Sequence, residues 1–349
     1  VSNNGGASSV KKLVESFNDS RIRYIEVPDL LPMCKHWEFM LSHAQGDFLT
    51  IIGDDDALMP KALLVVEDVL AEYPGTACVT HEPAQYYWPD YPVEELKNRY
   101  VYRGRTGIRK LASARNTLRE VVEFREWYGK LPFLYHGFVS RHVLEKIRAE
   151  NGGVFLRPAP DIFVDLVLGM HLESYVQVED CLTIGGQGAK STGTSCSVGS
   201  EAGKSFIEAH PKDMWPKYSI ASITLQVFEY IEFLSASSLV LVNRNIYWWG
   251  LVRNVANEGL LAPNDVQSKQ VFNDLKDVIN EHCRTIYRLP LLLLAGLLSS
   301  YPIFRILRKR GLSRRMQTNL RMRNAMHDFG ASNVFDVARS LDSTEDSLD

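Results

Sequence analysis

Three consecutive carboxylates, Asp54, Asp55 and Asp56, are the residues whose types and spacing most directly predict chemistry. They follow a short apolar run at 48–52, which Gly46 and Gly53 bound and which is typical of a buried strand. Three adjacent like charges are unfavourable unless a cation neutralises them. Carboxylate oxygens at a strand end suit Mg²⁺ or Mn²⁺, often shared with substrate phosphates. The alternative is a solvated acidic turn in which Asp56 caps the next helix.

Two further stretches carry candidate chemistry. Asp161 stands where an amphipathic helix begins after Pro158 and Pro160, so it is either a helix cap or a functional carboxylate. Residues 185–195 are rich in glycine and hydroxyl groups, and their backbone amides can approach a diphosphate, with Lys190 as a counter-charge. The spacing of a P-loop is absent, and a mobile linker is the alternative.

Strands and helices alternate at short spacing around these stretches. Apolar periodicity predicts helices at 8–17, 35–44, 60–72, 107–127 and 142–149, and strands at 21–27, 48–52, 77–80, 133–141 and 175–184. This alternation predicts an α/β fold with a doubly wound sheet. Ligands of such sheets bind beyond the carboxyl ends of the strands, which is where the three aspartates fall.

The segment 41–63 resembles the family two glycosyltransferases of the GT-A fold. In that family a helix ending in Ala-x-Gly-Asp leads into a strand and then an Asp-x-Asp metal motif, and this chain has Ala44-Gln45-Gly46-Asp47 before the acidic residues. The opening 1–9 is similar to the family's second strand and its Asp-(Asp/Asn)-Gly-Ser turn. Nothing corresponding to the family's first strand precedes this segment, so we expect a chain that lacks its first N-terminal strand. Gly53 replaces the family's first aspartate, and Asn3 or Asn4 replaces a nucleotide-contacting one.

The resemblance implies a GT-A domain with a doubly wound mixed sheet and a metal-dependent, inverting transfer. The sugar would pass from a nucleotide-sugar donor, with a UDP-sugar preferred, to a hydroxyl of a glycan or lipid-linked acceptor in cell-surface polysaccharide synthesis. The implied ligands for Mn²⁺ or Mg²⁺ are Asp54, Asp55 and Asp56, and the implied donor-binding residues are Asn3, Asn4, Asp54 and Lys190. The resemblance implies Asp161 as the general base, with Asp165 as the second candidate. The implied acceptor-side residues are His136 and Ser191.

Composition limits the class of partner. The net charge of −3 gives no reason to expect nucleic acid. Five scattered cysteines without a Cys-x-x-Cys pair argue against a zinc cluster or a disulfide framework, and favour a reducing compartment. We therefore expect a cytoplasmic protein.

Beyond about residue 200 the pattern becomes helical, with apolar spacing near 3.6 at 218–242, 243–258 and 264–287. We expect a GT-A domain at 1–200, a helical extension at 201–331 and a disordered acidic tail at 332–349. Within the extension, an apolar run followed by arginines at 289–315 is too short to span a bilayer. It suits either a peripheral position on an anionic surface, such as the inner face of the plasma membrane, or a core helix with a basic end.

Two other functions remain open from the sequence. A nucleotidyltransferase-like enzyme would also use carboxylates and a divalent ion, but it would normally carry a basic, glycine-rich loop near its first strand. A catalytically impaired, glycosyltransferase-like binding protein is suggested by the missing strand and by Asn3 and Asn4.

Overall fold

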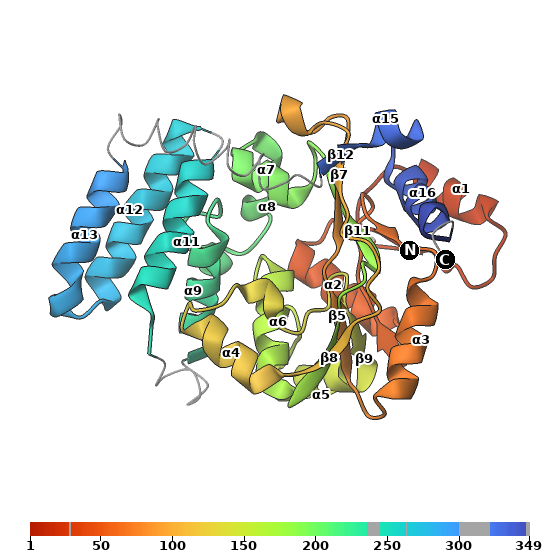
Figure 1. Ribbon diagram of the computed structural model, residues 1–349, viewed down its shortest axis with the longest axis horizontal. Coiled ribbons are helices and arrows are strands. Elements are labelled where there is room, and N and C mark those ends of the chain that lie inside the picture. Colours follow the sequence, from red (N-terminus) through yellow and green to blue (C-terminus); the bar gives the residue numbers. More distant parts are fainter. Residues whose placement is uncertain (28, 236–244, 263, 300–321, 347–349) are drawn as a thin grey trace.

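The computed structural model describes the chain except for residues 28, 236–244, 263, 300–321 and 347–349. Two five-stranded sheets stand edge-on at the centre of Figure 1, and helices cover both sides. The α/β class expected from the sequence is confirmed, because strands and helices alternate and the sheets are mixed. Among the residues described, no helix is both long enough and apolar enough to cross a membrane.

The first sheet has the order β3-β9-β5-β10-β8. Only its β5–β10 pair is parallel. Its strands are β3 (Phe48–Leu49), β5 (Cys78–His81), β8 (Arg109–Ser113), β9 (Phe138–Ser140) and β10 (Ser174–Val178).

The second sheet has the order β12-β7-β6-β11-β4, and only its β6–β11 pair is parallel. Its strands are β4 (Ala57–Leu58), β6 (Ala84–Tyr87), β7 (Arg99–Val101), β11 (Thr183–Gln187) and β12 (Met322–Asn324). A separate parallel pair joins β1 (Ser2–Asn3) to β2 (Ile25–Glu26).

The chain crosses from the first sheet to the second at three places, namely between β3 and β4, between β5 and β6, and between β10 and β11. Each crossing takes between two and seven residues, so the two sheets meet where these short segments pass between them. The three aspartates lie on the first crossing. We call residues 54–56 the acidic turn.

The helices that surround the sheets fall into two groups. Those from the first two hundred residues are α1 (Ser9–Ser16), α2 (Met33–His43), α3 (Ala62–Glu72), α4 (Ala114–Val122), α5 (Arg141–Asn151), α6 (Pro160–His171) and α7 (Thr192–Val198). The later ones are α8 (Glu201–Glu208), α9 (Ile223–Ser235), α11 (Trp248–Leu261), α12 (Asp265–His282), α13 (Thr285–Ser299), α15 (Ala325–Phe329) and α16 (Val334–Asp346). In Figure 1, α9, α11, α12 and α13 stand side by side at the left.

One hydrophobic core continues across residue 200, the boundary that the sequence analysis expected between two domains. Helix α6 is apolar nearly all round and is buried between α4 and α9. The ring of Phe163 on α6 meets that of Tyr230 on α9 at 5.9 Å, and Phe124 meets Phe228 of α9 at 6.0 Å. The helical extension therefore shares its interior with the α/β part.

The structure differs clearly from the sequence-based expectation at three segments. The single strand expected at 175–184 is instead two strands, β10 and β11, which belong to different sheets. Residues 107–127, expected as one helix, form β8 and then α4, because 109–113 pair with β10 and extend the first sheet. Residues 332–349, expected as a disordered tail, include helix α16, which buries Val334, Val337 and Leu341 against the second sheet. Arg105 and Asp342 form an ion pair of 2.6 Å that joins this helix to the loop after β7.

The segment 289–315, which the sequence analysis associated with a membrane surface, is described only in part. Residues 289–299 belong to α13, whereas 300–315 lie outside the described residues.

Candidate active site

The acidic turn gives its three carboxylates different surroundings. Asp56 is buried, and both of its oxygens accept hydrogen bonds from the protein. Its Oδ2 accepts from the Gly53 amide at 2.6 Å and from the Tyr135 hydroxyl at 2.5 Å, and its Oδ1 accepts from the Gly186 amide at 2.8 Å. The Nε2 of His136 lies 3.5 Å away. Asp56 thus closes the turn and ties it to β11.

Asp54 and Asp55 face a different environment. Asp54 is exposed and Asp55 is half-buried, and both line the main cleft of the molecule, as Asp56 also does. Asp55 accepts a hydrogen bond from the Ser191 hydroxyl. Burial raises the pKa of Asp55 despite that bond, and the negative charges of Asp56 and Asp54 raise it further. A cation beside these carboxylates would relieve the repulsion.

A side chain at position 53 would displace the polar groups that surround it. A Cβ atom there would lie 2.7 Å from Asp55 Oδ1 and 3.0 Å from the Tyr135 hydroxyl. The absence of a side chain lets the carboxylates of Asp55 and Asp56 turn inward. Among the residues described, no group of three or more His, Cys, Asp or Glu side chains is placed to hold a metal ion by itself.

Asp161 lines the same cleft as the acidic turn. Ala159 is the N-cap of α6 and Pro160 follows it, so Asp161 lies in the first turn and is not the cap. The Ala159 amide donates to the Tyr230 hydroxyl of α9 at 3.1 Å, which fixes the start of the helix. Burial raises the pKa of Asp161, and the amides of Ile162 and Asp161 oppose that rise.

Asp165 lies one turn further along α6 and is buried behind the cleft, whose lining does not include it. Its Oδ1 has no hydrogen-bond partner among the described residues. Burial, and then the nearby charge of Asp161, raises its pKa well above the ordinary value. The structure therefore favours a neutral carboxyl group at this position.

We expect Asp165→Asn to change the pH dependence of stability. A carboxyl whose pKa is raised in the folded state opposes folding increasingly as pH rises above about 4, with a slope of up to about 1.4 kcal/mol per pH unit. The carboxamide does not ionise, so the variant should gain stability relative to the parent between pH 5 and pH 8. Urea unfolding at both values measures this, and parallel pH profiles would contradict a neutral Asp165.

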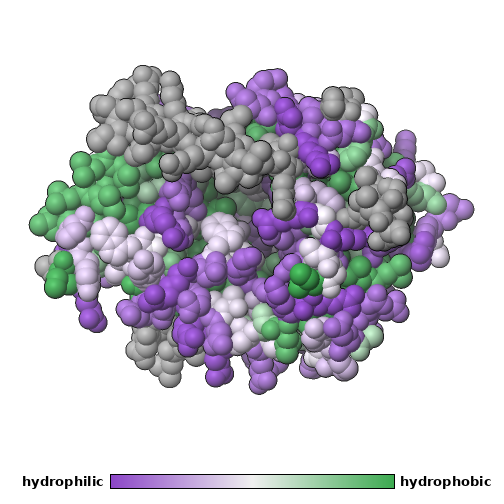
Figure 2. Space-filling model, viewed as in Figure 1, coloured by the Kyte–Doolittle hydropathy of each residue, from purple (hydrophilic) through white to green (hydrophobic). Residues whose placement is uncertain are grey.

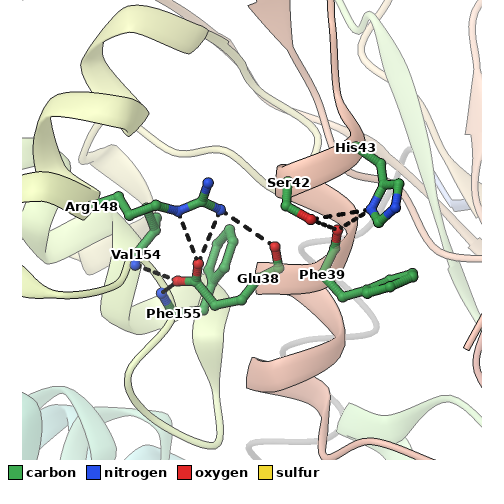
Figure 3. A network of polar contacts seen from close by, with 7 residues as sticks. All are labelled: Glu38, Phe39, Ser42, His43, Arg148, Val154 and Phe155. Carbon is green, nitrogen blue, oxygen red and sulfur yellow. Dashed lines mark hydrogen bonds and ion pairs between the residues drawn. The ribbon is translucent and has the colours of Figure 1, made fainter. Parts of the chain in front are cut away.

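Helix α2 supports both carboxylate stretches. The ring of Trp37 stacks on that of Tyr135 at 5.6 Å, and so positions the hydroxyl that donates to Asp56. Figure 3 shows the next residue, Glu38, reaching the segment that leads to α6. Glu38 accepts from the amides of Val154 and Phe155, the latter at 2.7 Å, and pairs with Arg148 of α5 at 3.1 Å.

Of the other predicted site residues, some line the cleft and one is buried behind it. Asn3 and Asn4 line the cleft, but their amide groups also hold the backbone at Gly6 and Leu31. Lys190 is exposed at the cleft, and Ser191 reaches Asp55. His136 is buried behind the acidic turn and does not line the cleft.

Sequence reasoning missed several residues that complete the cleft. The Trp88 indole donates to the Asp55 carbonyl at 3.1 Å, and the Ala189 amide donates to Asp90 at 3.3 Å. The aromatic insert after β6 and the glycine-rich stretch thus both close on the acidic turn. The sequence does show a cluster of Tyr, Trp and Pro at 86–92, which could have indicated a binding segment. Nothing in the neighbouring residues indicated that this cluster contacts position 55.

The cleft has a volume of about 2890 Å³. Pockets for drug-sized ligands occupy roughly 300–1,000 Å³, so this one has room for two substrates of moderate size.

No family model and no curated protein matches the chain. Among solved structures, S. aureus TarS 1-349 is similar to it, with 14% sequence identity and a TM-score of 0.43. The likeness covers 91% of this chain and 81% of the TarS chain. Similarity at this level does not establish the chemistry of the site, which depends on the residues of this chain.

Proposed function

We propose that this protein is a glycosyltransferase of the GT-A type, which transfers a sugar from a nucleoside-diphosphate donor to an acceptor hydroxyl with inversion. One observation carries the proposal. The acidic turn between the two sheets and Asp161 at the start of α6, more than a hundred residues later, line a single large cleft.

The carboxylates fit a divalent cation that is shared with a diphosphate. All three aspartates line the cleft, but Asp56 is already engaged by protein donors, so Asp54 and Asp55 would hold it. Two carboxylates without further protein ligands suit Mg²⁺ or Mn²⁺, which keep sites for water and phosphate oxygens. When bound, the cation would offset the negative charge of the leaving nucleoside diphosphate.

Asp161 is the candidate general base. Its carboxylate would accept the proton of the acceptor hydroxyl while that oxygen attacks the anomeric carbon. The bond between that carbon and the diphosphate oxygen breaks on the opposite face, which inverts the configuration. The raised pKa of Asp161 makes it a stronger base than an ordinary aspartate.

The remaining cleft residues suit the two substrates. Asn3 and Asn4 line the cleft and would contact the nucleotide, and Lys190 would supply a positive charge to the diphosphate. Tyr87 and Trp88 of the aromatic insert offer ring surfaces on which a sugar can stack. We place the reaction in the cytoplasm, with a UDP-sugar as donor and a glycan or lipid-linked acceptor.

The proposal predicts metal-dependent nucleotide binding. In calorimetry, UDP should bind in the presence of Mn²⁺ and lose at least about ten-fold in affinity when EDTA removes the metal, because the diphosphate and two carboxylates would otherwise repel one another. CDP, GDP and dTDP are the comparison ligands. Equal binding with and without metal, or no binding of any nucleoside diphosphate, would refute the proposal.

A further inference from the structure

Helix α13 presents an apolar face to solvent. Ile286, Leu289, Leu293 and Leu297 are 76%, 65%, 61% and 58% exposed, and Pro290 lies among them. Their spacing of three and four residues places them on one stripe of the helix. Leu291 and Ala295 on the opposite side are buried against the rest of the molecule. The helix is therefore apolar on the outside as well as on the inside.

This exposed face lies at one end of the molecule. Helix α13 packs on α12 and α11 and is the outermost of the row of helices in Figure 1. Figure 2 shows hydrophobic residues gathered at that same end. The outward side of an ordinary surface helix carries charged and polar side chains, and a contiguous apolar patch marks an interaction surface.

The charges in α13 and in the sequence that follows it indicate what kind of partner the apolar face would bind. From 283 to 327 the chain contains no aspartate or glutamate, although its net charge is −3 overall. Two arginines, Arg284 and Arg288, flank the start of the apolar face. Between α13 and β12 the sequence carries seven more cations, Arg305, Arg308, Lys309, Arg310, Arg314, Arg315 and Arg321. An apolar helix face in a strongly cationic stretch matches the two components of an anionic bilayer surface, acyl chains and negative headgroups.

We propose that the exposed face of α13, made by Ile286, Leu289, Leu293 and Leu297, docks on an anionic phospholipid bilayer. The leucines enter the boundary between headgroups and acyl chains, with the helix lying in the plane of the surface. Helix α13 has fifteen residues and one side packed on α12, so it lies on the membrane and does not span it. The inference does not depend on the proposed transfer reaction.

The test is sedimentation of the whole protein with vesicles. We expect it to bind vesicles of equal parts phosphatidylglycerol and phosphatidylcholine at about 0.05 M salt, and to bind less as salt is raised. The triple variant Leu289→Gln, Leu293→Gln, Leu297→Gln should lower the binding constant by at least about ten-fold. The matched control is Leu63→Gln with Leu64→Gln, two equally exposed leucines on α3, which should bind as the parent does.

Three results would overturn the proposal. The parent protein could fail to sediment with anionic vesicles at low salt. The triple variant could bind as strongly as the parent, which would assign binding to the cations alone. The parent could be a dimer that the triple substitution separates, without binding vesicles, which would make the face a contact between copies. Melting temperatures check the fold of each variant, and the single substitution Leu293→Glu, which should also weaken vesicle binding, replaces the triple variant if that one unfolds.

Discussion

Replacing Asp161 with asparagine should lower turnover by roughly 10²–10⁴-fold, while nucleotide affinity and melting temperature change little. The carboxamide is nearly the same size, and Ala159 rather than Asp161 caps α6, so the helix loses no cap. What it would lose is the proposed proton acceptor. Release of UDP from a UDP-sugar, measured with a panel of acceptors, gives the rate.

Asp165→Asn is the matched control for this measurement, because Asp165 stands on the same helix behind the cleft. Its turnover should stay near that of the parent. The pH dependence adds a second readout. Because burial raises the pKa of Asp161, the acidic limb of the rate profile should lie at higher pH than for an ordinary aspartate. Full turnover in the Asp161 variant, with a loss in the Asp165 variant, would transfer the role to Asp165.

The second large effect separates two neighbouring aspartates. Asp55→Asn should weaken Mn²⁺-dependent UDP binding by at least about ten-fold. It should leave the free energy of unfolding nearly unchanged, since Asp55 is half-buried and accepts one hydrogen bond, whereas Asp56 is buried and accepts three. Asp56→Asn should instead lower the free energy of unfolding by about 2–3 kcal/mol. A carboxamide NH₂ in place of one oxygen would face protein donors, which include the amides of Gly53 and Gly186.

Calorimetry with Mn²⁺ and UDP measures the first effect, and urea unfolding measures the second. The two variants act as controls for each other, because they change the same chemical group at adjacent positions. The assignment fails if Asp55→Asn unfolds as readily as Asp56→Asn, or if Asp56→Asn alone removes metal-dependent binding from a stable protein.

Local patterns predicted much of the fold and part of the site. The apolar run before Gly53 and the periodic helices α2, α3 and α5 gave correct elements, because their burial follows from residue spacing alone. Residues 109–113 were expected as helix, since their pairing with β10 depends on residues more than sixty positions away. Likewise, α16 is stabilised by the second sheet, and its polar composition gave no indication of that partner.

The same limit applied at the site. The sequence marked Asp54, Asp55 and Asp56 as a group but could not distinguish them, because the donors to Asp56 come from Tyr135 and Gly186. It proposed Asp161 as the base through a resemblance, which stays a prediction, and it left Trp88 unassigned. Contacts between distant segments decide these roles, and a single sequence does not display them.

The continuous core across residue 200 has a consequence for how this molecule loses its structure. The start of α6 is held by Tyr230, and its buried side meets aromatic rings of α9. Removal of the later helices would expose apolar surface on the helix that carries Asp161. We therefore expect the two halves to unfold as one cooperative unit, so that damage to the distant row of helices lowers the order of the segment that carries Asp161.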